Sequence, residues 1–124
     1  KGLISTFFRD EQTFNSTSIE AVKAVLPHAD KAVFHKGMIE KTCREVKDLK
    51  FVFVSLDMDL KQPMATALEF FYERTLPGGY LFLHDYNHAS IKGVKEVIAE
   101  FEAKHGRINK LPLADEGGSI IIVR

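Results

Sequence analysis

The sequence is poor in cysteine and in charge of one sign. Cys43 is its only cysteine, which excludes an internal disulfide, and its place in a predicted helix indicates a small buried thiol. Lysine and arginine together number 17, as do aspartate and glutamate, and the basic residues are scattered along the chain. Because no stripe of positive charge is available for a phosphate backbone, we do not expect nucleic acid as a partner.

Long apolar runs and several widespread motifs are also missing. The longest mostly apolar run, Phe51–Leu56, is too short to cross a bilayer, and the start of the chain does not resemble a signal peptide. We therefore expect a cytoplasmic protein with no membrane partner. The sequence has no G-x-G-x-x-G, no Walker loop and no G-x-S-x-G. It thus lacks the signatures of dinucleotide-binding folds, P-loop nucleotidases and serine hydrolases.

The residues that are present suffice for a hydrophobic core and alternate between helix and strand patterns. The chain has 124 residues, of which 45% are hydrophobic, and we expect a single domain over residues 1–124. Thr17 and Glu20 form a T-x-x-E capping box for a helix that ends at Pro27. Further helices are predicted over 38–46, from about Pro63 to Thr75, and from about Ser90 to Gly106.

Strand patterns lie between these helices. Phe51–Leu56 is apolar except at Ser55, which is typical of a central strand that is covered on both faces. Pro77-Gly78-Gly79 is expected to separate the preceding helix from the next strand. The other predicted strands are 31–35, 80–83, 110–113 and 119–123, the last two joined by a turn at 115–118. This alternation predicts an α/β fold with a three-layer sheet.

Carboxylates follow two of these strands. Asp57 and Asp59 come directly after one apolar strand, and Asp85 follows the next. Ligands of parallel sheets bind at the carboxyl ends of strands, and hard cations such as Mg²⁺ prefer carboxylate oxygens. The spacing therefore indicates a divalent metal site. An equally weighted alternative is that Asp59 caps the next helix and Asp85 caps a turn before Ser90.

Two further features near strand ends have more than one interpretation. His84 precedes Asp85 and faces the opposite side of an ideal strand; it could ligate a metal, orient Asp85, shuttle a proton, or simply donate to a backbone carbonyl. Lys36-Gly37 follows the predicted strand at 31–35. A glycine there would let a flat ligand approach the backbone, although an ordinary turn is the simpler explanation.

The order of these motifs resembles a known family. The run FVSLDMDLKQPMATALEFFYERTLPGGYLFLHDYN (Phe53–Asn87) is similar to the C-terminal half of macrocin O-methyltransferases, class I enzymes that use S-adenosylmethionine to methylate sugar hydroxyls of natural products. The similarity is carried by the series D-x-D-L-x-x-P, F-Y-x-R-x-x-P-G-G and D-Y, and it continues through STSIEAVKAVLP (Ser16–Pro27), KGMIEKT (Lys36–Thr42), IKGVKEVIAEF (Ile91–Phe101) and GGSIIIV (Gly117–Val123).

The resemblance implies a role for each site residue. Asp57 and Asp85 match metal ligands, with Mg²⁺ or Mn²⁺ as the ion, and Asp59 matches the general base. His84 stands where the family has a further acidic ligand, so it is expected either to join a softer metal site or to lie outside it. The segment Lys36, Gly37 and Met38 matches the loop on the adenine side of S-adenosylmethionine.

The resemblance also implies a Rossmann-like methyltransferase sheet, mostly parallel with an antiparallel C-terminal strand. The first two strands of that sheet, with the cofactor-binding glycine loop, are lacking from this chain, which is therefore expected to be a C-terminal fragment or a truncated form. Because such a sheet has unpaired edges, we expect a homo-oligomer. The expected substrate is a small molecule that bears a hydroxyl group.

A receiver-type phosphoacceptor domain is the competing hypothesis. Such modules have about this length, and the chain offers Asp10-Glu11 as an acidic pair, Asp57 as the acceptor and Lys110 with Pro112 as the Lys–Pro end. A third hypothesis is a catalytically inactive remnant that serves only in association. The methyltransferase resemblance accounts for more residues than either.

Overall fold

The computed structural model describes residues 18–88 and 93–124, and the chain divides into two compact units. Lys1–Lys36 forms the first unit and Gly37–Arg124 the second. The prediction of a single domain over the whole chain stays a prediction. No helix in the described part of the chain is long and apolar enough to cross a membrane.

The first unit contains a short helix and a 3₁₀ turn. Helix α1 (Ile19–Val25) begins at Ser18, whose Oγ accepts a hydrogen bond of 3.1 Å from the backbone N–H of Ala21. Ser18 is therefore the N-cap, and Thr17, the predicted cap, lies outside the described residues. The 3₁₀ turn η2 spans Ala29–Lys31.

The strand predicted over residues 31–35 is wrong. Lys31 ends η2, and residues 32–36 after it form neither helix nor strand. An extended segment is a strand only when a neighbour completes its backbone hydrogen bonds. Local composition favoured the extended conformation and could not supply that neighbour.

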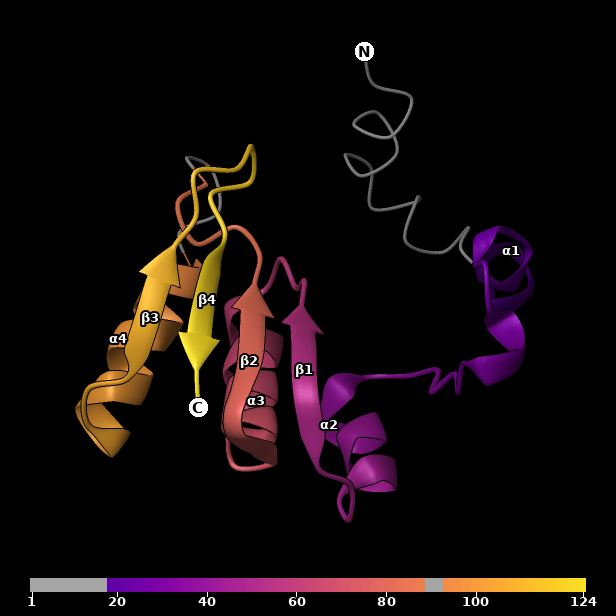
Figure 1. Cartoon of the computed structure of the whole chain (residues 1–124), viewed down its shortest axis with the longest axis horizontal. Helices are drawn as coiled ribbons and strands as arrows, with labels where there is room; N and C mark the ends of the chain where they lie inside the picture. The colour runs from indigo at the N-terminus through magenta and orange to yellow at the C-terminus, as the bar shows by residue number, and fades with distance from the viewer. Residues whose placement is uncertain (1–17, 89–92) are drawn as a thin grey trace. The chain divides into compact units, whose positions relative to one another are not determined.

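The second unit is built on a four-stranded mixed sheet of order β1-β2-β4-β3 (Figure 1). Adjacent strands β1 and β2 are parallel, whereas β4 is antiparallel to both of its neighbours, so β1, β2 and β3 share one direction. The expectation of a mostly parallel sheet with an antiparallel C-terminal strand is confirmed. The strands are β1 (Phe51–Leu56), β2 (Thr75–Leu83), β3 (Asn109–Pro112) and β4 (Ile120–Val123).

Strand β2 begins five residues earlier than the sequence predicted. Pro77-Gly78-Gly79 does not separate a helix from a strand; it lies within β2, next to a register shift against β1 between Phe51 and Phe53. A Cβ atom on Gly79 would lie 2.7 Å from the carbonyl oxygen of Val52, so only glycine allows the two backbones to approach here. The glycines therefore permit an irregular strand instead of breaking it.

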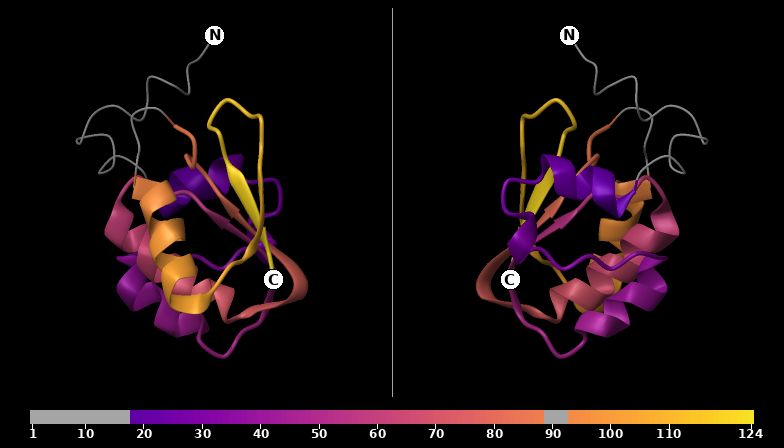
Figure 2. Two further views of the ribbon diagram at one scale, coloured as in Figure 1. Left: turned by 90° about the vertical axis from the view of Figure 1, so that its left-hand side faces the viewer. Right: turned by 90° about the vertical axis from the view of Figure 1, so that its right-hand side faces the viewer.

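Helices cover one face of this sheet (Figure 2). Strand residues Val54, Leu56, Leu81, Leu83, Ile120 and Ile122 are buried in one core cluster with helix residues Met64, Ala67, Leu68, Val94, Val97, Ile98 and Phe101. The helical elements of the unit are α2 (Ile39–Thr42), continued by the 3₁₀ turn η3 (Cys43–Val46), α3 (Lys61–Tyr72) and α4 (Gly93–His105). Cys43 is buried, as predicted. The predicted start of the last helix near Ser90 lies outside the described residues.

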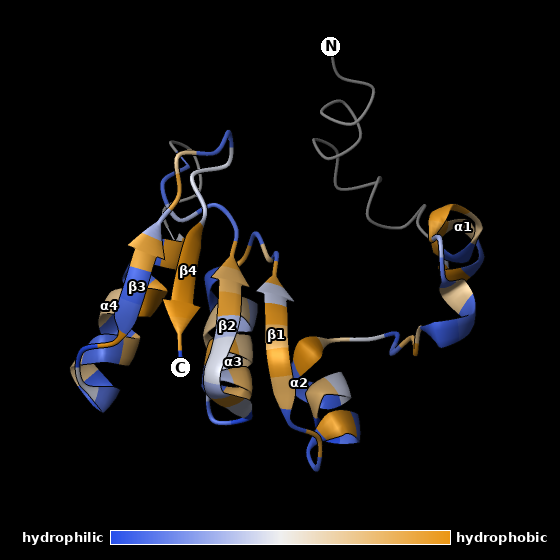
Figure 3. Ribbon diagram, viewed as in Figure 1, coloured by the Kyte–Doolittle hydropathy of each residue, from blue (hydrophilic) through white to orange (hydrophobic). Residues whose placement is uncertain are grey.

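The opposite face of the sheet is apolar and open within the described part of this unit. Figure 3 shows strongly hydrophobic residues along β1 and β4. Phe53 is 60% exposed, and its cross-strand partner Tyr80 is 47% exposed. The prediction that Phe51–Leu56 is a central strand covered on both faces is wrong for the described sheet, because β1 is its edge strand and only one of its faces is covered.

Candidate metal and acid–base site

Two neighbouring parallel strands deliver the candidate site residues to one edge of the sheet. Leu56, the last residue of β1, pairs with Leu83, the last residue of β2. The ladder continues for one more bond, because the N–H of His84 donates to the carbonyl oxygen of Leu56 over 2.9 Å. The residues after both strands, Asp57 and Asp85, are thereby held side by side, as expected from the carboxyl ends of parallel strands.

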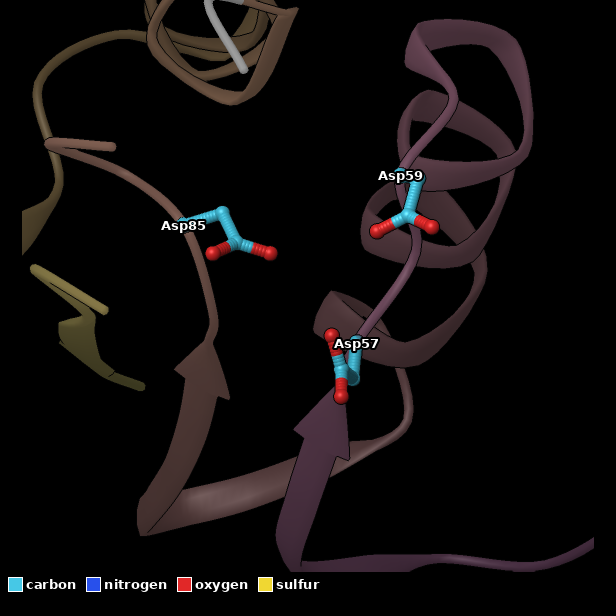
Figure 4. Close-up of side chains that lie close together, drawn as sticks. All are labelled: Asp57, Asp59 and Asp85. Atoms are coloured by element: carbon cyan, nitrogen blue, oxygen red, sulfur yellow. The ribbon is translucent and has the colours of Figure 1, made fainter. Parts of the chain in front are cut away.

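Three carboxylates meet there. Asp57, Asp59 and Asp85 each offer an oxygen atom, and these oxygens lie within 4.8 Å of one another. Figure 4 shows the side chains directed toward a shared space between the ends of β1 and β2. Asp57 and Asp59 are exposed and Asp85 is half-buried. Oxygen donors at this spacing fit a hard divalent cation, with water or substrate completing its shell.

The alternative that these acids only cap local structure receives no support at Asp59. The N-cap of α3 is Leu60, and no side chain accepts a hydrogen bond at that helix start. The alternative role of Asp85, as a cap before Ser90, involves residues outside the described part of the chain. Asp59 is therefore available for chemistry at the cluster.

The environment of Asp85 disfavours its charged form. Partial burial raises the pKa of the Asp85 carboxyl above its ordinary value, and the negative charge of Asp57 raises it further. Asp59 contributes in the same direction more weakly, whereas His88 and His84 oppose the shift. A cation placed between carboxylates that repel one another in this way would relieve the repulsion and stabilise their charged forms.

His84 is not part of the acidic cluster. Its Nε2 lies 3.4 Å from Oγ of Ser55 on β1, and its ring packs edge-on against Phe82 with centroids 4.7 Å apart. Phe82 and His84 are two residues apart along the chain, so both point to the open face of the sheet. Of the interpretations that the sequence left open, this placement favours the one in which a metal is held without His84.

The predicted cofactor-binding segment lies at the turn into α2. Gly37 has a φ of 148°, a conformation that favours glycine, and a Cβ atom there would lie 3.2 Å from Cγ2 of Thr42. The carbonyl oxygen of Met38 accepts from the N–H groups of Lys41 and Thr42, and Met38 itself is 61% exposed. Lys36 belongs to the first unit and is not placed relative to the cluster.

The turn between β3 and β4 contacts the loop that follows Asp85, a contact that local sequence does not predict. Residues 115–118 were predicted only as a connection, but Gly118 accepts a hydrogen bond of 2.8 Å from the N–H of Asn87, two residues after Asp85. The adjacent glycines signal unusual backbone conformation, yet nothing in the local pattern reveals which loop they contact.

Comparison with known proteins identifies the family. A family model described as macrocin-O-methyltransferase (TylF) matches residues 16–120. The chain belongs to this family. No curated protein matches the chain. Membership of the macrocin-O-methyltransferase family confirms the resemblance found in the sequence, and it makes the chain part of a methyltransferase family of enzymes.

Solved structures confirm the fold of this family member. The O-methyltransferase NovP is 23% identical with a TM-score of 0.53, over 60% of this chain and 30% of NovP. CalS11, a calicheamicin methyltransferase, is 13% identical with a TM-score of 0.59, over 71% of this chain and 35% of CalS11. An O-methyltransferase from Bacillus cereus, in complex with SAH, is 16% identical with a TM-score of 0.54, over 73% and 49% of the two chains.

The chain spans between about a third and a half of the length of these three proteins. The mixed α/β fold of this chain, in which β4 is antiparallel, matches these methyltransferases. A receiver domain has a purely parallel doubly wound sheet, which an antiparallel strand between two others does not fit. Its proposed acidic pair, Asp10-Glu11, lies outside the described residues.

Proposed function

We propose that this chain carries the catalytic edge of an O-methyltransferase that transfers a methyl group from S-adenosylmethionine to a hydroxyl of a sugar or glycosylated small molecule. The observation that carries the proposal is the cluster of Asp57, Asp59 and Asp85 at the ends of β1 and β2, in a chain of this family. The sugar as substrate is supported by CalS11, which is described as a TDP-rhamnose 3'-O-methyltransferase.

The donor set suits a divalent ion. Asp57 and Asp85 would hold Mg²⁺ or Mn²⁺, because both are oxygen ligands supplied by adjacent strand ends. When bound, the ion supplies a Lewis acid that makes a nearby hydroxyl easier to deprotonate. His84 stays outside this proposed ligand set because its ring is engaged by Ser55 and Phe82.

Asp59 is the proposed general base. Its carboxylate is exposed and belongs to the same cluster, so it can reach a hydroxyl that is held beside Asp57 and Asp85. As the hydroxyl oxygen forms its bond to the methyl carbon, the carbon–sulfur bond breaks with its electron pair going to sulfur. The hydroxyl proton passes to Asp59, and the products are a methyl ether and S-adenosylhomocysteine.

S-adenosylmethionine as the methyl donor is supported by the family and by the SAH in the Bacillus cereus structure. Lys36, Gly37 and Met38 are the proposed contacts to its adenine side, and the lack of a side chain at Gly37 supports a close approach of a flat ring to its backbone. Because the chain spans only part of the matched proteins, cofactor binding is proposed for the whole protein that carries it.

A methyl-transfer assay tests the proposed function. The chain, and any longer protein that carries it, is incubated with methyl-labelled S-adenosylmethionine and a panel of nucleotide-linked sugars and glycosylated macrolides. We expect label in an acceptor, loss of that label after treatment with EDTA, and recovery when Mg²⁺ or Mn²⁺ is restored.

Other outcomes favour other functions. Transfer that persists in EDTA would remove the metal from the proposal. Phosphorylation of Asp57 by acetyl phosphate, without methyl transfer, would favour the receiver hypothesis. Metal binding without turnover on any acceptor would favour a remnant that serves only in association.

We also propose that the chain self-associates through β1. This strand is the edge of the described sheet, and Phe53 on it is exposed on the open face. Unpaired, apolar edges favour pairing with another chain. Sedimentation equilibrium should give a mass above the 14.0 kDa of one chain, and Phe53→Lys should lower it.

Leu111→Lys is the matched control for this measurement. Leu111 lies on β3 at the other edge of the sheet and is exposed to nearly the same extent as Phe53. If the chains associate through β1, Leu111→Lys should leave the mass from sedimentation equilibrium equal to that of the wild type. A wild-type chain that stays monomeric at every concentration would contradict the proposal.

A further inference from the structure

Asp85 has an unusual backbone conformation for a candidate metal ligand. Its φ is 59°, and it is the only residue other than glycine with a positive φ in the described part of the chain. Left-handed backbone is strained for a residue with a side chain, although aspartate tolerates it better than most. Such a conformation persists only where surrounding contacts hold it, so the contacts of the Asp85 loop decide where its carboxylate points.

The turn between β3 and β4 supplies those contacts. The N–H of Asn87 donates to the carbonyl oxygen of Gly118 over 2.8 Å. The turn itself is closed by two bonds to Asp115: its carbonyl oxygen accepts from the N–H of Gly118 at 3.1 Å, and its Oδ1 accepts from the N–H of Ser119 at 2.6 Å. The loop after β2 therefore rests on a turn that has its own internal support.

The two loops are also in close steric contact. A Cβ atom on Gly118 would lie 2.6 Å from Cβ of Asn87, which is closer than real Cβ atoms approach, and 3.1 Å from its Cα, which is a tight contact. A Cβ atom on Gly117 would lie 3.8 Å from Oδ1 of Asp85, an ordinary contact distance. The turn thus packs against the backbone after Asp85 and lies close to the Asp85 carboxylate. Only glycine fits at position 118 without a shift of Asn87.

We propose that Gly118 is a positioning residue that holds the loop of Asp85 so that its carboxylate stays beside Asp57. The inference rests on the proposed function for its relevance to metal binding, but the placement of Asp85 is testable without metal. Supporting residues around a metal ligand typically change metal affinity by about 10–100-fold when they are altered. Gly118→Ala should therefore weaken Mn²⁺ binding by about tenfold or more.

Gly106→Ala is the matched control. Gly106 has a φ of 87° and Gly118 a φ of 61°, so alanine is strained by its backbone at both positions. A Cβ atom on Gly106 meets nothing within 4 Å, whereas one on Gly118 collides with Asn87. The two variants differ in the contact to the Asp85 loop, and Gly106→Ala should bind Mn²⁺ like the wild type.

Two measurements decide the inference. Mn²⁺ affinity is measured by electron paramagnetic resonance, and the backbone chemical shifts of Asp85, which report its φ, are measured by NMR in metal-free protein. We expect Gly118→Ala to move the Asp85 shifts away from left-handed values and to weaken Mn²⁺ binding. If Gly118→Ala does not fold, Asp115→Ala, which removes the carboxylate that accepts from the N–H of Ser119, should give a smaller change in the same direction.

Unchanged Asp85 shifts in the folded variants would overturn the inference, as would Mn²⁺ binding by Gly118→Ala equal to that of the wild type. A wild-type chain that binds no Mn²⁺ would instead count against the proposed function. In that case the Asp85 shifts alone still decide whether Gly118 holds the loop.

Discussion

Replacing Asp57 by Asn should lower the affinity for Mn²⁺ by about 100-fold or more, since a direct ligand is expected to matter more than the outer partners that typically cost 10–100-fold. Asp57 follows β1 directly, and its oxygen lies within 4.8 Å of those of Asp59 and Asp85. The amide keeps the shape of the side chain but removes one of the charges that attract the cation. Isothermal titration with Mn²⁺ at fixed ionic strength measures the loss.

The same variant should become more stable when metal is absent. Burial and the Asp57 charge raise the pKa of Asp85 in the folded protein above its ordinary value. The folded state therefore binds the proton of the Asp85 carboxyl more tightly than the unfolded state does. This protonation stabilises the fold below the ordinary carboxyl pKa, and the stabilisation is lost as pH rises through the higher pKa of the folded state. Asp57→Asn weakens this repulsion, so urea denaturation in EDTA at neutral pH should show a higher free energy of unfolding.

Opposite signs for metal affinity and metal-free stability separate this mechanism from simple misfolding. A variant that merely damaged the fold would lose both. His84→Ala is the control at the same edge of the sheet: its Nε2 lies near Ser55, so Mn²⁺ affinity should not change. If His84→Ala binds Mn²⁺ as weakly as Asp57→Asn does, the metal is held by His84 as well.

The convergence of Asp57 and Asp85 was predictable from the sequence because it follows from strand direction alone. Two apolar strands that are joined by one helix and run parallel must end at the same edge of the sheet, and the register of Leu56 with Leu83 confirms this. The family motifs added the antiparallel C-terminal strand. Both features are encoded in short segments, which is why they could be inferred without a structure.

The features that were missed depend on contacts between distant segments. The strand predicted over 31–35 is not formed, and β1 lies at the edge of the described sheet, although composition placed it at the centre. Sequence also gave no sign that Asp85 is left-handed or that Gly118 supports its loop. The pairing of these two loops is set by how β2 and β4 align, which no local pattern reveals.

Asp59→Asn should separate turnover from metal binding. Asp59 belongs to the acidic cluster but does not cap α3, and general bases typically contribute about 10²–10⁴-fold to a rate. With Asp57 and Asp85 intact, Mn²⁺ affinity should fall far less than in Asp57→Asn. The rate of methyl transfer at saturating Mn²⁺ and acceptor should fall by about 10²–10⁴-fold, because asparagine has no basic oxygen that can take the hydroxyl proton.

Asp48→Asn is the matched control for this experiment. Asp48 is also exposed, but it lies before β1 and so at the opposite end of that strand from Asp59. It should leave both turnover and Mn²⁺ affinity unchanged. Full turnover in Asp59→Asn would show that another group takes the proton, whereas equal losses of turnover and Mn²⁺ affinity would make Asp59 a metal ligand in place of a base.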